Sequence, residues 1–484
     1  MKEIVLATIN AKWIHPSLAL RLLKANLGPL EDSCEIIEFA LRQPLGEKLE
    51  ALLAVHPRIL GISVSIWNHV ATVELLKELE KAWTAKSGLC GARPVVVLGG
   101  PEVSHLPEDA EIFSFADYVI RGEGETAFRL LCEEILTAGY PAKVQKISPQ
   151  FINAENVNLG EIKSGYHLYT DEDLAKKLIY VEASRGCSFN CEFCLSAVKG
   201  GQGTVREFPL EPFLAEMDAL VGRGAKTFKF LDRTFNLNIK RALKICGFFL
   251  EKIEQCKETR QKSDIVVHFE MVPSLFPDEL RETLVRFPPG TLRLEIGIQT
   301  LNPEVSERIC RRSNPEKELE AIRFLREKTN AVIHADLIAG LPGEDIASFA
   351  RGFDRLWLAL SETEKSPKAD YQRAEIQLGI LKLLPGAPIS RHNETFGMRY
   401  SSLPPYEVLE TSAMSVGDLQ RIKNFARFWE LIINRDLIKF TESKPVFEIF
   451  MVLSDRLFAH FGRNWGIDKD ELRETVKSYW NKLS

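Results

Sequence analysis

The sequence alternates between short apolar runs and amphipathic helical stretches, and this alternation restricts the fold more than any other feature. Over residues 1–145 the apolar runs are EIVLATI, CEIIEFA, ILGISVSIW and PVVVLGG, and the stretches between them place apolar residues three and four positions apart. Continuous apolar strands between amphipathic helices are typical of a parallel sheet that is covered on both faces. We therefore expect an α/β, Rossmann-like doubly wound domain over residues 1–145.

A second series of strand and helix patterns covers residues 177–390. Its predicted strands lie at 177–184, 227–232, 265–271, 291–299, 331–340 and 375–384, and helical stretches such as 212–224 and 315–328 separate them. Repeated units of this kind favour a parallel TIM-type barrel, closed or partial, with its chemistry at the carboxyl ends of the strands. The polar residues 146–176 between the two series are expected to form a linker.

The alternation stops near residue 390, and residues 391–484 are expected to form a mainly helical C-terminal domain. Helical periodicity is seen at 407–435 and 471–483. Aromatic residues in this region alternate with basic ones, and such a surface could stack a nucleobase. The alternative is a small helical core with a solvated outer face.

The formal net charge of −5 argues against a chain that binds nucleic acid by bulk charge. No apolar run has the length of a membrane span, and the N-terminus lacks the features of a signal peptide. We therefore predict a cytoplasmic protein with no membrane association. In that compartment cysteines stay reduced, so clustered thiols indicate metal or redox chemistry rather than disulfides.

Three cysteines are clustered in SRGCSFNCEFC, where Cys187, Cys191 and Cys194 have the spacing C-x3-C-x2-C directly after the first strand of the second series. The other six cysteines are scattered, and we expect them in the core. A structural zinc site uses four protein ligands, as does a common iron–sulfur pattern. Three thiolates on a four-iron cluster would leave one iron open to bind something. A zinc site that takes a distant fourth ligand is the alternative.

The loop resembles the cysteine loop of radical S-adenosylmethionine (SAM) enzymes, including the aromatic Phe193 before the last cysteine. Four further segments of the barrel resemble the same family: REFPLE, FKFLDRTFN, EIGIQT and DLIAGLPGED. The resemblance implies that Cys187, Cys191 and Cys194 bind a 4Fe–4S cluster and that SAM chelates its fourth iron. It also implies an electron donor such as flavodoxin or ferredoxin, which reduces the cluster so that SAM yields a 5′-deoxyadenosyl radical.

The same resemblance implies a set of SAM-binding residues that end or line the barrel strands: Phe193, Asp232, Glu270, Glu295, Gln299, Gly340 and Gly343. For the carboxylates, a structural salt bridge is the alternative. For the two glycines, the alternative is an ordinary loop turn. The sequence departs from the common family pattern at Arg233, where a second acidic residue often stands.

The first domain has no G-x-G-x-x-G after its first strand, so a dinucleotide site is poorly supported. Its GGPEVSH and RGEGE segments instead resemble the cobalamin-binding domain that precedes many radical SAM domains. The implied cobalamin contacts are Trp13, His15, Ser65, Trp67, Gly99, Gly100, Glu102, Gly122 and Glu123. The D-x-H-x-x-G motif that supplies a cobalt ligand in many cobalamin proteins is missing. His15 is a candidate ligand or a loop element, and Trp13 and Trp67 either pack on the corrin or belong to the core.

Together these resemblances imply a cobalamin-dependent radical SAM enzyme, of the subset with an unassigned C-terminal domain. The expected reaction is methylation of an unactivated carbon through the 5′-deoxyadenosyl radical and methylcobalamin. One alternative is a rearrangement or ring-forming reaction with the same cofactors. Another is a non-enzymatic iron–sulfur electron carrier or zinc-binding protein. The expected substrate is a small molecule, with a tRNA nucleoside as the minor alternative.

Overall fold

The computed structural model describes residues 2–84, 93–137, 148–197, 204–258, 265–361, 374–437 and 445–480. Its contacts divide the chain into two compact units. Unit 1 comprises Met1–Ala183 and Arg206–Lys229, and unit 2 comprises Ser184–Val205 and Phe230–Ser484. The predicted domain boundaries, which follow sequence patterns rather than contacts, stay a prediction.

The first sheet lies in unit 1 and has the strand order β2-β1-β3-β4-β5-β6, with every adjacent pair parallel. Its strands are β1 (Ile4–Asn10), β2 (Cys34–Ala40), β3 (Ile59–Ser63), β4 (Val95–Gly99), β5 (Tyr118–Arg121) and β6 (Gln150–Asn153). All of β1 is buried, as expected for a central strand that is covered on both faces. The predicted α/β doubly wound fold is confirmed.

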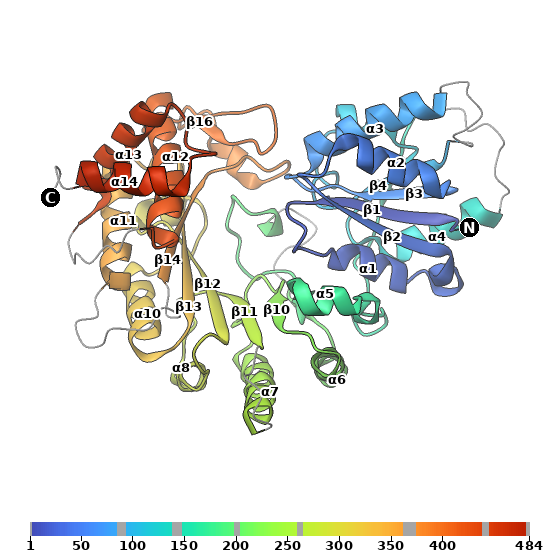
Figure 1. Ribbon diagram of the computed structural model, residues 1–484, viewed down its shortest axis with the longest axis horizontal. Helices are drawn as coiled ribbons and strands as arrows, with labels where there is room; N and C mark the ends of the chain where they lie inside the picture. The colour runs from blue at the N-terminus through green and yellow to red at the C-terminus, as the bar shows by residue number, and fades with distance from the viewer. Residues whose placement is uncertain are drawn as a thin grey trace. The chain divides into compact units, whose positions relative to one another are not determined.

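Helices cover both faces of this sheet (Figure 1), with α2 and α3 on one face and α1 and α4 on the other. Their bounds are α1 (Leu18–Ala25), α2 (Leu45–Val55), α3 (His69–Thr84) and α4 (Gly124–Thr137), with short helices η1 (Gly28–Ser33) and η2 (Glu111–Phe115). Successive side chains of β1 enter different cores. Val5 belongs to the core that contains Leu76 of α3, and Leu6 to the core that contains Leu20 of α1.

The residues predicted as a linker contain regular structure. They form β6, which pairs with β5 at the edge of the sheet, then η3 (Tyr166–Leu168) and α5 (Asp171–Lys176). Thr170 and Asp173 begin α5 with a capping box. These elements are too short to produce a clear apolar period, which explains why the sequence pattern indicated a linker.

The second sheet also has six strands, in the order β14-β13-β12-β11-β10-β7. These are β7 (Ile179–Val181), β10 (Thr227–Phe230), β11 (Val266–Met271), β12 (Leu292–Gln299), β13 (Val332–Ala339) and β14 (Ala374–Ile380). Strand order follows chain order, and β14 and β7 stand at opposite ends, which is the arrangement of a partial barrel. Each strand falls within a predicted strand or shifts from it by one residue.

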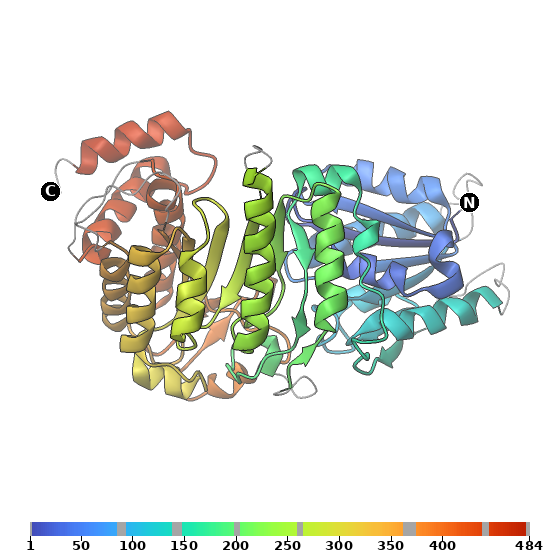
Figure 2. The ribbon, with the colours of Figure 1, turned by 90° about the horizontal axis from the view of Figure 1, so that it is seen from below.

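Helices pack on the outer side of the second sheet, and Figure 2 shows α7, α8 and α10 side by side. The helices of unit 2 that accompany the strands are α7 (Ile239–Glu258), α8 (Asp278–Val285), α9 (Pro303–Arg308), α10 (Pro315–Lys328) and α11 (Ile346–Ser361). Helix α6 (Leu210–Gly222) belongs to unit 1. The remaining short elements are β8 (Ser184–Arg185), η4 (Leu195–Ala197) and β9 (Arg206–Glu207).

The C-terminal region is mainly helical, as predicted. It contains η5 (Pro388–His392), β15 (Arg399–Tyr400), β16 (Val408–Glu410), α12 (Val416–Trp429), the π-helical turn η6 (Glu430–Asn434), α13 (Phe447–Phe461) and α14 (Lys469–Trp480). The prediction of a helix from residue 407 is wrong at its start, because β16 precedes the capping box of Ser415 and Asp418 that begins α12. Residues 481–483 of the other predicted helix lie outside the described residues.

The aromatic residues of the C-terminal region mostly form its core. Phe425, Trp429 and Phe450 are buried and contact one another through ring stacking and edge contacts. This supports the alternative of a helical core over a nucleobase-stacking surface. Within the described ranges, no helix is both long and apolar enough to cross a bilayer.

Candidate functional site

The cysteine loop follows β8 in unit 2 and begins with a tight turn. Gly186, directly before Cys187, has φ of +97°, and a Cβ atom there would lie 2.5 Å from the backbone oxygen of Thr204. Only glycine adopts this conformation without strain. The loop closes on itself where the Cys194 backbone N–H donates a hydrogen bond to the Cys191 carbonyl at 3.0 Å. The three cysteines are thus held on one short, folded segment.

Polar groups from the turn after β10 and from the segment after α9 approach the thiols. The Cys187 sulfur lies 3.6 Å from the Thr234 hydroxyl oxygen, and Arg311 Nη1 donates to the Cys191 sulfur at 3.9 Å. Burial raises the pKa of the Cys191 thiol, while the nearby Arg311 guanidinium acts in the opposite direction. A guanidinium beside a buried sulfur favours the thiolate, which is the form that ligates a metal.

The donor set fits an iron–sulfur cluster. All three cysteines are free thiols, and Cys194 and Cys187 lie close enough to Cys191 to contribute to the raised pKa of its thiol. Within the described part of the chain, no three His, Cys, Asp or Glu side chains are grouped as ligands of a single metal ion. Three free thiols on one short segment suit three corners of an iron–sulfur cluster.

The scattered cysteines are mostly core residues, as predicted: Cys34, Cys132 and Cys246 are buried and Cys256 is half-buried. The prediction is wrong for Cys310, which is exposed. Its Sγ lies 3.3 Å from a carboxylate oxygen of Glu192, so it stands at the surface beside the cysteine loop. Cys90 lies outside the described residues.

Of the predicted SAM-binding carboxylates, Asp232 and Glu270 lie near the carboxyl ends of β10 and β11, whereas Glu295 lies in the middle of β12. Asp232 follows β10, is buried, and accepts a hydrogen bond from the Ser184 hydroxyl at 2.5 Å. Glu270 and Glu295 are direct cross-strand neighbours on β11 and β12, and both are half-buried on one face of the sheet. His268 Nε2 lies 3.3 Å from the Glu295 carboxylate. The sheet thus brings these two carboxylates together on one face.

Gln299 ends β12 with φ of +68°, next to an irregularity in the pairing of β12 with β13. A bulge near a site redirects a side chain away from the regular alternation of the strand. The neighbouring Gly297 carbonyl accepts a hydrogen bond from Arg311. Phe193 is half-buried in the cysteine loop. These positions are consistent with the predicted contacts, and the contacts themselves stay a prediction.

Gly340 and Gly343 follow β13 and both have positive φ. A Cβ atom on Gly340 would lie 2.5 Å from Val408 Cγ1, and one on Gly343 would lie 2.6 Å from Arg308 Nη1 and 2.8 Å from the Phe396 ring. The C-terminal region therefore makes the close approach at Gly340, and it shares that approach with Arg308 at Gly343. A role beside the adenosyl group stays a prediction.

Glu344, the next-to-last residue of the DLIAGLPGED segment, is expected to make folding stability depend on pH. It is 2% exposed, and burial raises its pKa from 4.5 to about 7 despite hydrogen bonds from Thr300 and Ser348. The folded state therefore holds this proton more tightly than the unfolded state. The resulting stability is fully present below about pH 4.5 and is lost as the pH rises through about 7.

We expect Glu344→Gln to remove this dependence. At about pH 8 the variant should be more stable than the parent by up to about 3 kcal/mol, and near pH 4.5 the two should be alike. Urea denaturation at both pH values measures the difference. Glu282→Gln, at an exposed position on α8, is the control and should leave the pH dependence unchanged. Equal pH profiles for parent and Glu344→Gln would contradict the assignment.

The predicted cobalamin contacts lie together along one edge of the first sheet. Trp13 and His15 follow β1, Ser65 and Trp67 follow β3, Gly99 and Gly100 end β4, and Gly122 and Glu123 follow β5. Strand order reverses at β1, because β2 lies on one side of it and β3 on the other. Open parallel sheets bind ligands at such a switch point, beyond the carboxyl ends of the strands.

Two of these residues present apolar surface to solvent. The exposed fractions of Trp13 and Trp67 are 52% and 53%. The alternative that both belong to the core is therefore wrong. The Lys177 ammonium lies 4.9 Å from the centre of the Trp13 ring. Two exposed indoles on adjacent loops at the switch point fit the flat apolar face of a corrin.

His15 has a hydrogen-bond partner on one ring nitrogen. The Tyr180 hydroxyl lies 2.9 Å from His15 Nδ1, and burial, followed by Lys12, lowers the pKa of the imidazole. A neutral imidazole whose second nitrogen is hydrogen-bonded can ligate a metal through the first. The chemistry thus permits cobalt ligation, and the loop role remains the alternative.

The two predicted acidic contacts have protein partners. Glu102 is buried and lies 2.9 Å from His69 Nδ1. Glu123 forms an ion pair with Arg206 and accepts a hydrogen bond from the Val157 backbone N–H at 2.9 Å. Ser65 is buried, and its backbone N–H donates to Asn68. These three residues shape the loops, and direct contact with cobalamin stays a prediction for each.

Close packing of two loops at this edge of the first sheet requires a glycine at Gly100. Its φ is +106°, and a Cβ atom there would lie 2.5 Å from the Val64 backbone oxygen. The loop after β4 thus lies directly against the loop after β3. Any larger residue would separate the two loops that carry Ser65 and Glu102.

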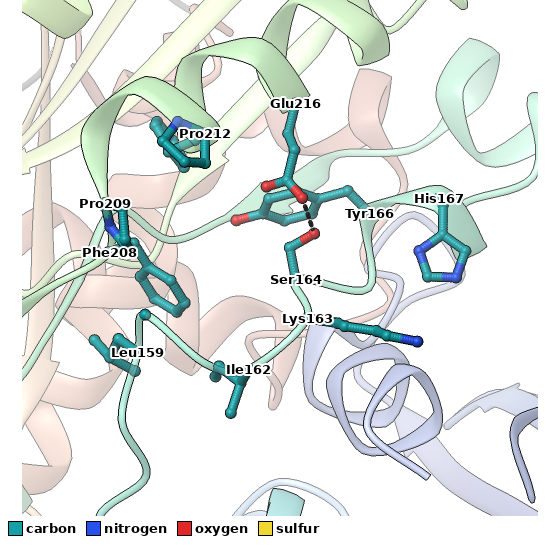
Figure 3. A pocket seen from close by; sticks show the side chains of 12 residues that line it. Leu159, Ile162, Lys163, Ser164, Tyr166, His167, Phe208, Pro209, Pro212 and Glu216 are labelled. Atoms are coloured by element: carbon teal, nitrogen blue, oxygen red, sulfur yellow. Dashed lines mark hydrogen bonds between the residues drawn. The ribbon is translucent and has the colours of Figure 1, made fainter. Parts of the chain in front are cut away.

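A separate cavity of about 280 Å³ lies in unit 1. Its lining combines apolar side chains, among them Leu159 and Phe208, with a polar pair in which the Ser164 hydroxyl donates to Glu216 at 2.5 Å (Figure 3). Burial raises the pKa of Glu216. None of the predicted cluster, SAM or cobalamin residues lines this cavity, so we assign it no part in their binding.

Sequence reasoning missed two residues of the cysteine loop environment, Arg311 and Glu192. Arg311 contacts Cys191 across 120 residues of sequence, so no local pattern indicates it. Glu192 lies within the motif itself, but its burial and its partners come from distant segments. The only indication of Glu192 in the sequence is that a charged residue stands between two predicted ligands, Cys191 and Cys194.

Comparison with known proteins yields two family matches. Residues 4–132 match the B12 binding domain, and residues 181–356 match the Radical SAM superfamily. An uncharacterized methyltransferase of Pyrococcus horikoshii is 29% identical over 266 residues, which are 51% of this chain and 54% of the relative. The chain therefore spans about half the length of this curated relative.

Two solved structures resemble the whole chain. The radical S-adenosylmethionine methyltransferase TsrM from Kitasatospora setae, solved with tryptophan substrate and a SAM analog, has a TM-score of 0.60 at 18% identity and full coverage of both chains. The cobalamin-dependent S-adenosylmethionine radical enzyme OxsB, solved with aqua-cobalamin and SAM, has a TM-score of 0.63 at 15% identity, covering 99% of this chain and 79% of OxsB. At these identities the likeness concerns the fold.

Proposed function

This chain is a radical SAM enzyme whose B12-binding domain precedes the barrel in sequence, and on that premise we propose that it is a cobalamin-dependent methyltransferase acting on an unactivated carbon. The observation that carries the proposal is the pairing of two sites in one chain. A three-thiol loop follows the first barrel strand, and a switch-point edge with two exposed indoles belongs to the first sheet.

When bound, the cluster and SAM supply the 5′-deoxyadenosyl radical, and cobalamin supplies the methyl group. The protein's part is binding and orientation. Cys187, Cys191 and Cys194 would hold the cluster, with Arg311 beside Cys191. The proposed SAM contacts are Phe193, Asp232, Glu270, Glu295, Gln299, Gly340 and Gly343. The carboxylates among them suit the ammonium and ribose hydroxyls of SAM, since both are hydrogen-bond donors.

In unit 1, Trp13 and Trp67 would pack on the corrin, and the loops that carry Ser65, Gly100 and Glu102 would line the crevice for the nucleotide tail. His15, Gly99, Gly122 and Glu123 complete the proposed set. Because aromatic rings pack favourably on apolar surfaces, the two indoles would shield part of the corrin from solvent.

The proposed substrate is a small molecule, and the proposed electron donor is a flavodoxin or ferredoxin. A tRNA nucleoside is less favoured, because Phe425, Trp429 and Phe450 are buried rather than displayed for stacking. The cytoplasmic location stays a prediction.

The test is anaerobic purification from cells supplied with cobalamin, followed by an absorbance spectrum and iron and corrin analysis. We expect both chromophores in one preparation. With methyl-deuterated SAM, a methylated product should carry the label, whereas a rearranged product would carry none. A preparation with an intact cluster and no corrin affinity would overturn the methyltransferase proposal.

We expect Trp13→Ala and Trp67→Ala to weaken cobalamin binding by about tenfold each, since each removes an aromatic contact from the interface. Both side chains are largely exposed, so folding should be unaffected. Titration with hydroxocobalamin measures the dissociation constant. Trp465→Ala is the matched control, because Trp465 is 67% exposed and belongs to unit 2. Unchanged affinity in both unit 1 variants would place the corrin elsewhere.

A further inference from the structure

Glu192 lies in the cysteine loop between Cys191 and Cys194 and contacts several residues outside that loop. Its carboxylate is buried, with the side chain 7% exposed. One oxygen, Oε2, lies 2.7 Å from His392 Nε2, and the other, Oε1, lies 2.6 Å from Arg391 Nη2. A buried carboxylate is stable when cationic and hydrogen-bonding partners surround it in this way.

The backbone of Glu192 is also fixed on both sides. Its N–H donates to the Ile309 carbonyl at 3.1 Å, and its carbonyl accepts from the Ile389 N–H at 3.0 Å. One residue of the cysteine loop is therefore joined to the segment after α9 and to η5. The contact with His392 spans 200 residues of sequence.

The segment that contains η5 also contacts a second loop of the barrel. Phe396, four residues after His392, packs against Gly343 and lies under the Arg308 guanidinium, whose carbon is 4.7 Å from the ring centre. Arg308 in turn donates to the Pro342 carbonyl at 2.6 Å. Residues 388–396 thus connect the cysteine loop with the loop after β13.

We propose that Glu192 is a positioning residue for the iron–sulfur cluster. Through His392, Arg391 and the Ile389 backbone it fixes the cysteine loop to the C-terminal region, so that Cys191 and Cys194 are held in ligating positions before iron binds. The C-terminal region is then part of the cluster site, in addition to any role in binding substrate. Residues that orient metal ligands typically change metal affinity by about 10- to 100-fold when they are replaced.

The test compares Glu192→Ala, Glu192→Gln and His392→Gln in the full chain after anaerobic reconstitution. The measurements are iron and sulfide content, the EPR spectrum of the reduced cluster, and the rate of iron loss to a chelator. We expect iron loss about tenfold faster or more in Glu192→Ala, an intermediate rate in Glu192→Gln, and altered g-values in both. Far-UV circular dichroism and cobalamin binding by unit 1 should be unchanged.

Glu394→Gln is the matched control, because Glu394 is an exposed carboxylate two residues from His392. The double variant Glu192→Gln/His392→Gln should lose iron no faster than the faster single variant, since both act through one contact. If Glu192→Ala does not fold, the rate of iron loss and the g-values of Glu192→Gln and His392→Gln test the proposal. Folded variants with iron loss and g-values like the parent would overturn the proposal. The inference rests on the cluster and not on methyl transfer, so an inactive chain that binds the cluster still tests it.

Discussion

Replacing Cys191 by Ser should leave a folded chain that binds almost no iron and does not cleave SAM. Cys191 is the central thiol of the loop, it is buried, and Arg311 donates to its sulfur. A hydroxyl remains protonated where the thiolate would ligate, so one cluster corner loses its ligand. Iron should fall from about four per chain to near zero. Cleavage should fall by at least about a thousandfold, because a cluster that loses one protein ligand is poorly retained.

The control for this experiment is Cys256→Ser, which removes a half-buried thiol of α7 outside the loop. Iron content and SAM cleavage should match the parent in the control. Iron analysis, the visible spectrum and detection of 5′-deoxyadenosine measure the outcome. If Cys191→Ser retained a full cluster, a ligand from another segment would have to complete it, and the three-thiol assignment would be wrong.

The strands of both sheets could be predicted because each is a continuous or alternating apolar run between polar turns. The seven residues of β1 are all buried, and β11 and β13 alternate buried and half-buried positions. The sequence also indicates where to expect the site, since chemistry in such folds lies at the carboxyl ends of strands. The strands that the apolar runs at 3–9 and 331–340 predict are present in the structure as β1 and β13.

Contacts between distant segments could not be predicted. The Glu192–His392 contact and the approach of Val408 to Gly340 depend on how the C-terminal region packs on the barrel. No local period encodes such packing. The same reason explains Cys310, which sequence reasoning placed in the core because free cysteines are usually buried. Its position beside Glu192 is set by the turn after α9, where Cys310 has a positive φ of 54°.

Gly100 and Gly340 both have positive φ, but different atoms exclude a side chain at the two positions. Positive φ at Gly100 and Gly340 agrees with the need for glycine. However, the atom that excludes a side chain at Gly340 belongs to Val408, and the one at Gly100 belongs to the backbone of Val64. The first can move as a side chain, whereas the second is fixed by the sheet. Substitution at Gly100 should therefore be the more damaging.

Replacing Gly100 by Ala should destabilise unit 1 by about 3 kcal/mol and abolish tight cobalamin binding. The backbone at φ of +106° is strained for any residue with a Cβ atom, which costs about 1–3 kcal/mol. In addition, that atom would stand 2.5 Å from the Val64 carbonyl oxygen and 2.9 Å from the Val64 nitrogen, so the loops after β3 and β4 must separate. Separation displaces Ser65 and Glu102 from their places at the switch point.

The neighbouring Gly99 provides a matched control for this prediction. Its φ is not in the left-handed region, and a Cβ atom there would meet the Ile120 carbonyl oxygen at 3.7 Å, an ordinary contact. Gly99→Ala should therefore cost less than about 1 kcal/mol, and it serves as the control for stability. The control for cobalamin affinity is Gly46→Ala, because Gly46 is exposed on α2 of unit 1 and a Cβ atom there would meet no atom within 4 Å. Urea denaturation compares Gly100→Ala with Gly99→Ala, and hydroxocobalamin titration compares it with Gly46→Ala. Equal denaturation midpoints for both would mean that the β3 and β4 loops yield to a side chain, and that their close contact does not shape the crevice.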